Sequence, residues 1–139
     1  MTDPFSLVTG VAGLLSFAGA VIGQCYRYGC AASGAPEEAK RLLSEVMGLS
    51  GVLVGVQGLV KQNDQRGLQF EMILKECKSV LEILSSKLQK YDPDGAQSSR
   101  KRTMNRLLWP LRKGDTDELI MALERHKLAL SLALDALSA

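Results

Sequence analysis

Hydrophobic side chains recur at spacings of three and four residues along most of the chain, which is the period of an amphipathic α-helix. Loop-forming segments, QNDQRG and DPDG, separate the apolar runs. Helices are therefore expected over about 36–61, 68–91 and 114–137. Their apolar seams are Leu42, Val46, Leu49, Leu53, Val56 and Val60; Phe70, Ile73, Cys77, Val80, Leu84, Leu88 and Tyr91; and Leu119, Leu123, Leu130, Leu134 and Leu137, with His126 at the position between Leu123 and Leu130. No alternation typical of strands is present, so the pattern predicts an all-α helical bundle.

The N-terminal segment differs from the other helices because it carries no charge between Asp3 and Arg27. Asp3 is expected to cap a helix that begins at Pro4 and continues to near Tyr26. The uncharged window, positions 4 to 26, has 23 residues, and about 20 helical residues cross the hydrocarbon core of a bilayer. The segment is therefore a membrane span, a cleaved signal or the first helix of a soluble bundle. The opening MTDP has an acid and no Lys or Arg, which argues against a secretory signal.

Small residues form a stripe on each of the first two helices. The first stripe is Ser6, Thr9, Gly13, Ser16, Ala20 and Gly23, and the second is Ser44, Gly48, Gly51, Gly55 and Gly58. The four glycines of the second stripe cost about 4 kcal/mol of helix propensity relative to alanine, so a compensating packing role is expected. Close helix packing of one stripe against the other in a hairpin is the expected resting arrangement. The same stripe would let the first helix pack against copies of itself in a bilayer, and on this expectation Gly13→Leu would overpack the resting hairpin.

A basic connector, residues 98–114, precedes the last helix and is expected to contain a short helix that breaks near Pro110. Its positive residues are Arg100, Lys101, Arg102, Arg106, Arg112 and Lys113. Such a run favours contact with anionic lipid, each charge being worth about 1 kcal/mol near the membrane surface. The alternative is a solvated loop. Trp109 is either a headgroup anchor or an ordinary core residue, and the second interpretation is preferred.

Composition narrows the function classes. The chain has 139 residues, a net charge of +2, three cysteines and one histidine. The odd cysteine number argues for a reducing compartment, and the absence of metal-ligand spacing argues against a zinc site. No nucleophile–base set or cofactor fingerprint is present, so neither an enzyme nor a cofactor is expected. No aromatic residues are interleaved for base stacking, so nucleic acid is not an expected partner.

Cys25 and Cys30 flank the apolar segment and are either palmitoylation sites or, as we prefer, buried thiols.

Three blocks of the chain resemble one family. They are DPFSLVTGVAGLLSFAGAVI, APEEAKRLLSEVMGLSGVL and LLWPLRKGDTDELIMALERHKLALSLAL. In this order they are similar to the HeLo-like domains at the N-termini of fungal NLR-type receptors and of amyloid-signalling cell-death effectors. The resemblance implies one domain over 1–139, with 1–26 as an apolar N-terminal helix and 98–114 as the basic connector. It further implies four main helices arranged as in the mixed-lineage-kinase-domain-like necroptosis executor.

In that family the N-terminal helix targets and disrupts membranes after oligomerisation. The resemblance therefore implies a membrane-permeabilising cell-death domain, cytoplasmic at rest and at the plasma membrane on activation. The implied partners are anionic lipids, copies of the chain itself, and a receptor or amyloid-signalling region in cis or in trans. A non-inserting adaptor domain is the alternative, and a constitutive membrane protein is a third. The expected insertion residues are Phe5, Leu7, Val8, Gly10, Val11, Gly13, Leu14, Leu15, Phe17, Gly19, Val21, Ile22 and Gly23.

Overall fold

The computed structural model describes residues 4–30, 35–62, 70–90, 109 and 111–138. In this part of the chain the helices are α1 (Pro4–Arg27), α2 (Glu37–Gln62), α4 (Glu71–Lys90) and α6 (Lys113–Ser138). The described residues contain no strand. The predicted all-α helical bundle is confirmed, and each predicted helix end lies within a few residues of the observed one.

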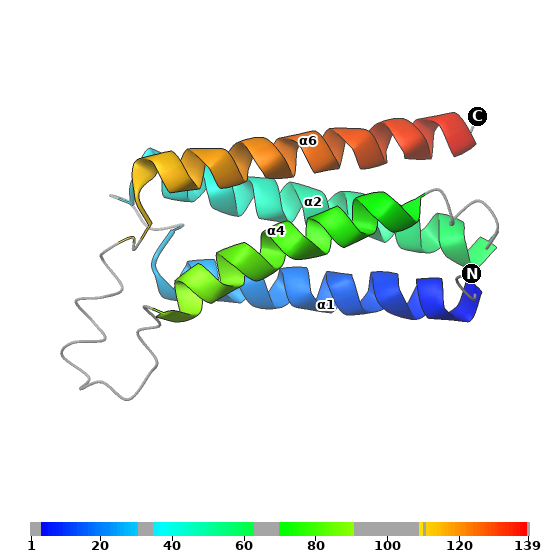
Figure 1. Cartoon of the computed structure of the whole chain (residues 1–139), viewed down its shortest axis with the longest axis horizontal. Coiled ribbons are helices and arrows are strands. Elements are labelled where there is room, and N and C mark those ends of the chain that lie inside the picture. The colour runs from blue at the N-terminus through cyan, green and yellow to red at the C-terminus, as the bar shows by residue number, and fades with distance from the viewer. Residues whose placement is uncertain (1–3, 31–34, 63–69, 91–108, 110, 139) are drawn as a thin grey trace.

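The four helices lie side by side along the long axis of the molecule (Figure 1). α1 and α4 run in one direction, and α2 and α6 run in the other. α1 packs against α2 and α4, and α6 packs against the same two helices. α1 and α6 therefore occupy opposite corners of the bundle, and α2 and α4 occupy the other two.

One hydrophobic core runs through the bundle. The whole predicted seam of α2, from Leu42 to Val60, is fully buried. The α4 and α6 seams are buried at most described positions, while Ile73, Val80, Leu134 and Leu137 are only partly buried against the core. The predicted seam residue Tyr91 lies outside the described residues. Burying such side chains is worth about 1.5–3 kcal/mol each relative to exposure, which explains why helical periodicity alone predicts the bundle.

α1 ends in a glycine cap. Gly29 has φ 71°, the left-handed conformation that favours glycine. The amide of Gly29 donates to the carbonyl of Tyr26 at 2.9 Å, and the amide of Cys30 donates to the carbonyl of Cys25 at 3.2 Å. These two bonds define a Schellman motif, in which Cys25 and Cys30 form the accompanying side-chain contact. The YGC stretch therefore terminates the helix, as the sequence predicts.

The basic connector lies mostly outside the described residues. Trp109, Leu111 and Arg112 are described and are not helical, and α6 begins at Lys113. The predicted short connecting helix falls on residues that the structure does not describe.

Candidate functional site

The bulky side of α1 faces the core. Val11, Ala18 and Val21 are fully buried, and Leu14 is nearly so. The small residues from Thr9 to Gly23 are on the opposite side, facing solvent. A Cβ atom added at Gly10, Gly13, Gly19 or Gly23 would meet no atom within 4 Å.

The expectation that the α1 stripe docks against α2 is therefore wrong. The bulky side chains have more apolar area to remove from water, and the bundle buries them instead. The expected overpacking by Gly13→Leu is wrong for the same reason, because the space beside Gly13 is open. The two helices are neighbours, as predicted, but they meet through other faces.

The four glycines of α2 divide into two pairs. A Cβ at Gly48 would lie 3.3 Å from Cδ and Nζ of Lys127, and one at Gly55 would lie 3.2 Å from Cδ1 of Leu134. Both neighbours belong to α6. Gly51 and Gly58 face open space. Gly48 and Gly55 thus face α6, whose side chains rather than the α1 backbone lie beside them, and an added Cβ at Gly51 or Gly58 would meet no atom within 4 Å.

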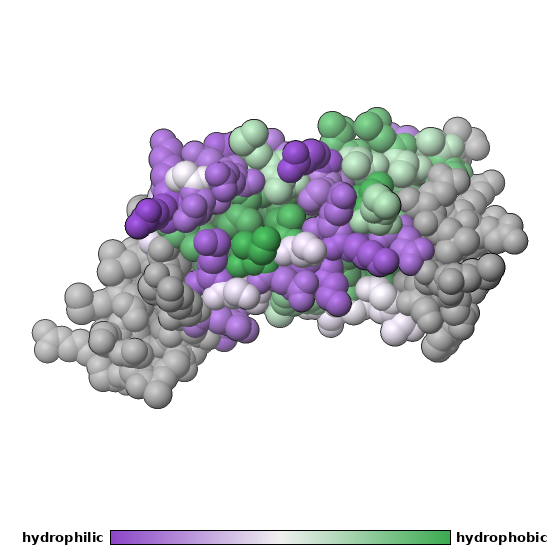
Figure 2. Space-filling model, in the orientation of Figure 1, coloured by the Kyte–Doolittle hydropathy of each residue, from purple (hydrophilic) through white to green (hydrophobic). Residues whose placement is uncertain are grey.

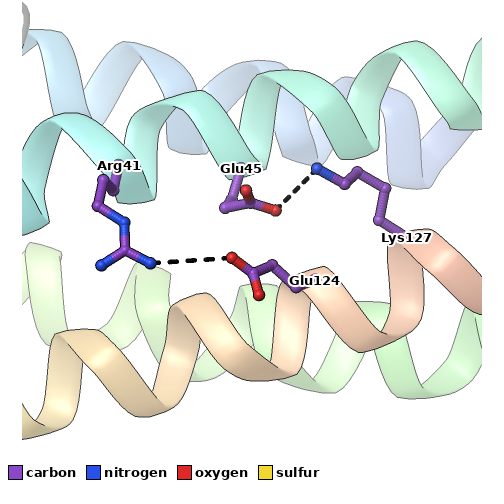
Figure 3. A network of polar contacts seen from close by, with 4 residues as sticks. All are labelled: Arg41, Glu45, Glu124 and Lys127. Carbon is purple, nitrogen blue, oxygen red and sulfur yellow. Dashed lines mark ion pairs between the residues drawn. The ribbon is translucent and has the colours of Figure 1, made fainter.

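An ion-pair cluster joins α2 to α6 beside Gly48 (Figure 3). Nζ of Lys127 lies 2.9 Å from Oε1 of Glu45, and these two side chains are 32% and 17% exposed. Nη2 of Arg41 lies 3.9 Å from Oε1 of Glu124, and both of these side chains are at least half exposed. Because Gly48 has no side chain, the Lys127 stem can lie across α2 and reach Glu45. Sequence analysis missed this cluster, since its partners are more than 80 positions apart.

The half of the bundle that contains the start of α1 has little charge on three helices. No charged residue occurs in positions 4–26 of α1, 46–60 of α2 or 128–134 of α6. Val54, Leu128 and Leu132 are more than half exposed there. Figure 2 shows apolar side chains gathered over the C-terminal part of α6.

Two described helices are long and apolar enough to cross a membrane by length and composition. The qualifying segments are Thr9–Arg27 of α1 and Glu37–Lys61 of α2, and a third of each is buried in the bundle. Core helices of soluble bundles and signal sequences meet the same criterion. The sequence indicated only α1 as a candidate span, and by length and composition α2 is a second one. Both insertion into a membrane and packing in a bundle are compatible with this criterion.

The remaining insertion residues occupy intermediate positions. Leu15, Phe17 and Ile22 are partly buried against the core. Phe5, Leu7 and Val8 lie in α1, but their side chains are outside the described part of the structure. Among the insertion residues whose side chains the structure describes, the bulky ones are thus buried or partly buried, and the glycines are exposed.

Few of the proposed lipid-contact residues are described. Arg112 and Lys113 are exposed at the start of α6. Arg100, Lys101, Arg102 and Arg106 lie outside the described residues. The structure therefore places two of the six basic residues at one end of the bundle.

Trp109 packs on the bundle as a partly buried residue. Its ring meets that of Tyr28 edge to face, with centroids 6.2 Å apart. Its Nε1 donates to Oγ1 of Thr116 at 3.1 Å. The core interpretation of Trp109 is confirmed for this conformation.

Two further polar contacts hold α1 to α4. The buried Oγ of Ser85 donates to Oε1 of Gln24 at 3.2 Å. The hydroxyl of Tyr28, directly after α1, donates to the carbonyl of Leu88. Sequence analysis missed both contacts; a glutamine in an otherwise apolar helix was the available signal, because a buried amide needs a partner.

His126 lies in the interior of the bundle. It is 9% exposed between α6 and α4, and its Nδ1 lies 3.6 Å from Oε2 of Glu76. Burial lowers the pKa of His126, and Glu76 partly offsets this effect. Among the described residues no group of three or more His, Cys, Asp or Glu side chains is placed to hold a metal ion.

The three cysteines are buried free thiols. The hydrogen bond with Cys30, together with burial, raises the pKa of Cys25 far above its usual range. Burial, and to a lesser degree Glu76, raises the pKa of Cys77 to about 12. The preferred interpretation of Cys25 and Cys30 as buried thiols is confirmed.

No protein-family model, curated protein or solved structure matches the chain in comparisons with known proteins.

Proposed function

We propose that the chain is a membrane-permeabilising cell-death execution domain of the HeLo-like type. Oligomerisation triggers it, α1 leaves the bundle, and its glycine-rich segment enters the bilayer. The resting bundle is cytoplasmic, and the activated oligomer acts at the plasma membrane. A receptor or amyloid-signalling region, in cis or in trans, supplies the trigger.

The observation that carries this proposal is a set of helical glycines with nothing beside them. They are Gly10, Gly13, Gly19 and Gly23 in α1 and Gly51 and Gly58 in α2. Each costs about 1 kcal/mol relative to alanine within a helix. Within the described part of the bundle no contact needs the missing side chains, so the cost has no compensation there. A second packing, in which another backbone approaches this face, would supply one, as small-residue stripes do between helices in bilayers.

The other side of α1 suits the same second state. Val11, Leu14 and Val21 are buried at rest and would face lipid tails after insertion. A helix of 24 residues is about 36 Å long, which exceeds the hydrocarbon core of about 30 Å. The protein thus has two ways to keep these side chains out of water. If the free energies of the docked and the inserted state differ by only a few kcal/mol, oligomerisation can shift the population from the first state to the second.

Membrane attraction before insertion is assigned to the basic connector. Six positive residues lie between Arg100 and Lys113, with no acid among them. At about 1 kcal/mol each, they would concentrate the domain at an anionic leaflet. Clustered copies would then present their exposed glycine faces to one another.

The proposal is tested by dye release from vesicles that contain phosphatidylserine. Gly13→Glu introduces a charge into the inserting helix, and the open space at Gly13 lets the resting bundle keep its fold. Ser79→Glu is the matched control, because Ser79 is exposed on α4. Wild type and Ser79→Glu are expected to release dye, and Gly13→Glu is expected to release at least tenfold less.

Equal release by all three proteins would exclude insertion of α1. An inert wild type that still binds its receptor region would favour the non-inserting adaptor. Circular dichroism and thermal melts of the variants confirm that the bundle is intact before each assay.

A further inference from the structure

The C-terminal ends of α1 and α4 and the N-terminal end of α6 lie at the end of the bundle opposite the N-terminus (Figure 1). Tyr28 follows α1 and donates its hydroxyl to the carbonyl of Leu88 in α4. Trp109 covers Tyr28 edge to face, at 6.2 Å and an interplanar angle of 87°. Its indole N–H donates to Thr116 of α6, whose own hydroxyl donates to the carbonyl of Arg112 at 3.0 Å. We call Tyr28, Leu88, Trp109 and Thr116 the Tyr28 cluster.

This cluster fixes the C-terminal end of α1 by directional contacts. Further up the helix, the Gln24–Ser85 bond adds another. The side chains that α1 buries between Val11 and Val21 are apolar, and their contacts tolerate sliding better than hydrogen bonds do. The end of α1 beside Trp109 is therefore the point at which a local change has the largest effect on docking.

Trp109 also belongs to the segment that carries the basic residues. Arg112 and Lys113 follow it within four positions and are exposed. An indole ring is amphipathic and favours the headgroup region of a bilayer. Trp109 thus has two alternative environments, the Tyr28 cluster in the resting bundle and the headgroups of a membrane to which its basic neighbours are drawn.

We propose that the Tyr28 cluster couples anionic-lipid binding to the release of α1. When Arg112 and Lys113 contact an anionic leaflet, Trp109 moves from Tyr28 into the headgroups. Water then reaches the Tyr28–Leu88 hydrogen bond and competes for it. This inference rests on the proposed function, since it names what regulates the same helix.

The resting role of the cluster is tested on the full chain without lipid. Hydrogen exchange is measured over residues 21–28 of α1 and, for comparison, over 46–56 of α2. Trp109→Leu and Tyr28→Phe are expected to exchange roughly three- to tenfold faster over 21–28 and to leave 46–56 unchanged, because an edge-to-face pair or one hydrogen bond contributes that factor to a local opening. Tyr26→Phe is the matched control, because Tyr26 lies on the same helix and is 51% exposed.

Unchanged exchange over 21–28 would overturn the cluster's role. A uniform increase over both segments would overturn it as well, because it would indicate general loss of stability. Thr116→Val gives an independent check, since it removes the acceptor of the indole N–H, together with the bond of that hydroxyl to the Arg112 carbonyl, and keeps the side-chain shape.

The coupling to lipid is tested with wild type, in which Trp109 is the only tryptophan. Vesicles with phosphatidylserine are expected to shift the Trp109 emission and to accelerate exchange over 21–28. Neutral phosphatidylcholine vesicles and inorganic phosphate, the free form of the same anion chemistry, are expected to do neither. If phosphate alone reproduces the change, or if anionic vesicles shift the emission without accelerating exchange, the coupling is wrong.

Dye release separates this inference from the proposed function. Trp109→Leu should release dye at a lower protein concentration than wild type and depend less on the phosphatidylserine fraction. Release identical to wild type in both respects would reject the coupling and leave the proposed function standing. A wild type that releases nothing would reject the proposed function, while the exchange measurements would still decide the role of the cluster.

Discussion

The ammonium of Lys127 lies 2.9 Å from the Glu45 carboxylate, and its stem crosses α2 at the position where Gly48 has no side chain. This contact ties α2 to α6 within the charged half of the bundle. Glu45 is only 17% exposed, so solvent can replace little of what Lys127 provides. The contribution of this pair to stability should therefore lie between two limits. Losing one partner of a buried ion pair is costly, whereas losing a surface ion pair costs little.

Lys127→Met is expected to lower the free energy of unfolding by about 1–2 kcal/mol, because it leaves a mostly buried carboxylate without its partner. Lys75→Met is the matched control. Lys75 pairs with Glu71 at 3.9 Å and its side chain is 77% exposed, so its loss should cost less than about 0.5 kcal/mol. Urea denaturation measures both. If Glu45→Gln restores no stability to Lys127→Met, the pair does not account for the effect.

Alanine substitutions at glycines of α1 and α2 should change the stability of the bundle by different amounts. Gly13→Ala and Gly51→Ala add a methyl group into open space and are expected to stabilise the resting bundle by about 0.5–1 kcal/mol each. Gly48→Ala and Gly55→Ala gain the same helix propensity but displace Lys127 and Leu134, so their net gain should be smaller. Thermal melts rank the four variants. Equal gains at all four positions would show that the α6 side chains adjust without cost.

The bundle follows from the sequence because its seams combine helical spacing with a polar opposite face. The buried positions of α4 and α6 are marked in this way, and even the histidine within the α6 seam is buried as its position implies. The cap at the end of α1 also follows from local chemistry, since Gly29 is the residue that tolerates the left-handed conformation there. The predicted cap at Asp3 lies outside the described residues.

The orientation of α1 does not follow from the sequence. Both of its faces are uncharged, so no charged residue marks the outer side. The helical period gives two stripes without saying which of them is buried. The answer depends on volumes in the assembled core, where Val11, Ala18 and Val21 fill space that glycines would leave empty. The Glu45–Lys127 and Gln24–Ser85 contacts join distant positions and likewise require the assembled bundle.

Acidification should destabilise the bundle through His126. Its pKa is lowered in the folded protein, chiefly by burial and against the attraction of Glu76, so the unfolded chain takes up a proton first as pH falls below 6.5. The contribution of neutral His126 to the free energy of unfolding is therefore fully present above pH 6.5. It declines as the pH falls from that value to the lower pKa of the folded state. His126→Leu removes this contribution, and its urea midpoint should vary less with pH over this window. Glu76→Gln should instead steepen the decline, because it removes the carboxylate that favours the charged imidazole.

The thiols should be unreactive while the bundle is folded. Burial and Glu76 raise the pKa of Cys77 to about 12, and Cys25 and Cys30 are shielded at the end of α1. Only the thiolate attacks a disulfide reagent, so at pH 8 labelling with Ellman's reagent is expected to be more than 100-fold slower in buffer than in urea. Ser79→Cys, which places a thiol on the exposed face of α4, should add one fast-reacting group and leave the other three slow. Fast reaction of a native cysteine would mean that its helix opens at rest, and with Cys25 or Cys30 it would locate that opening at the end of α1 that the Tyr28 cluster holds.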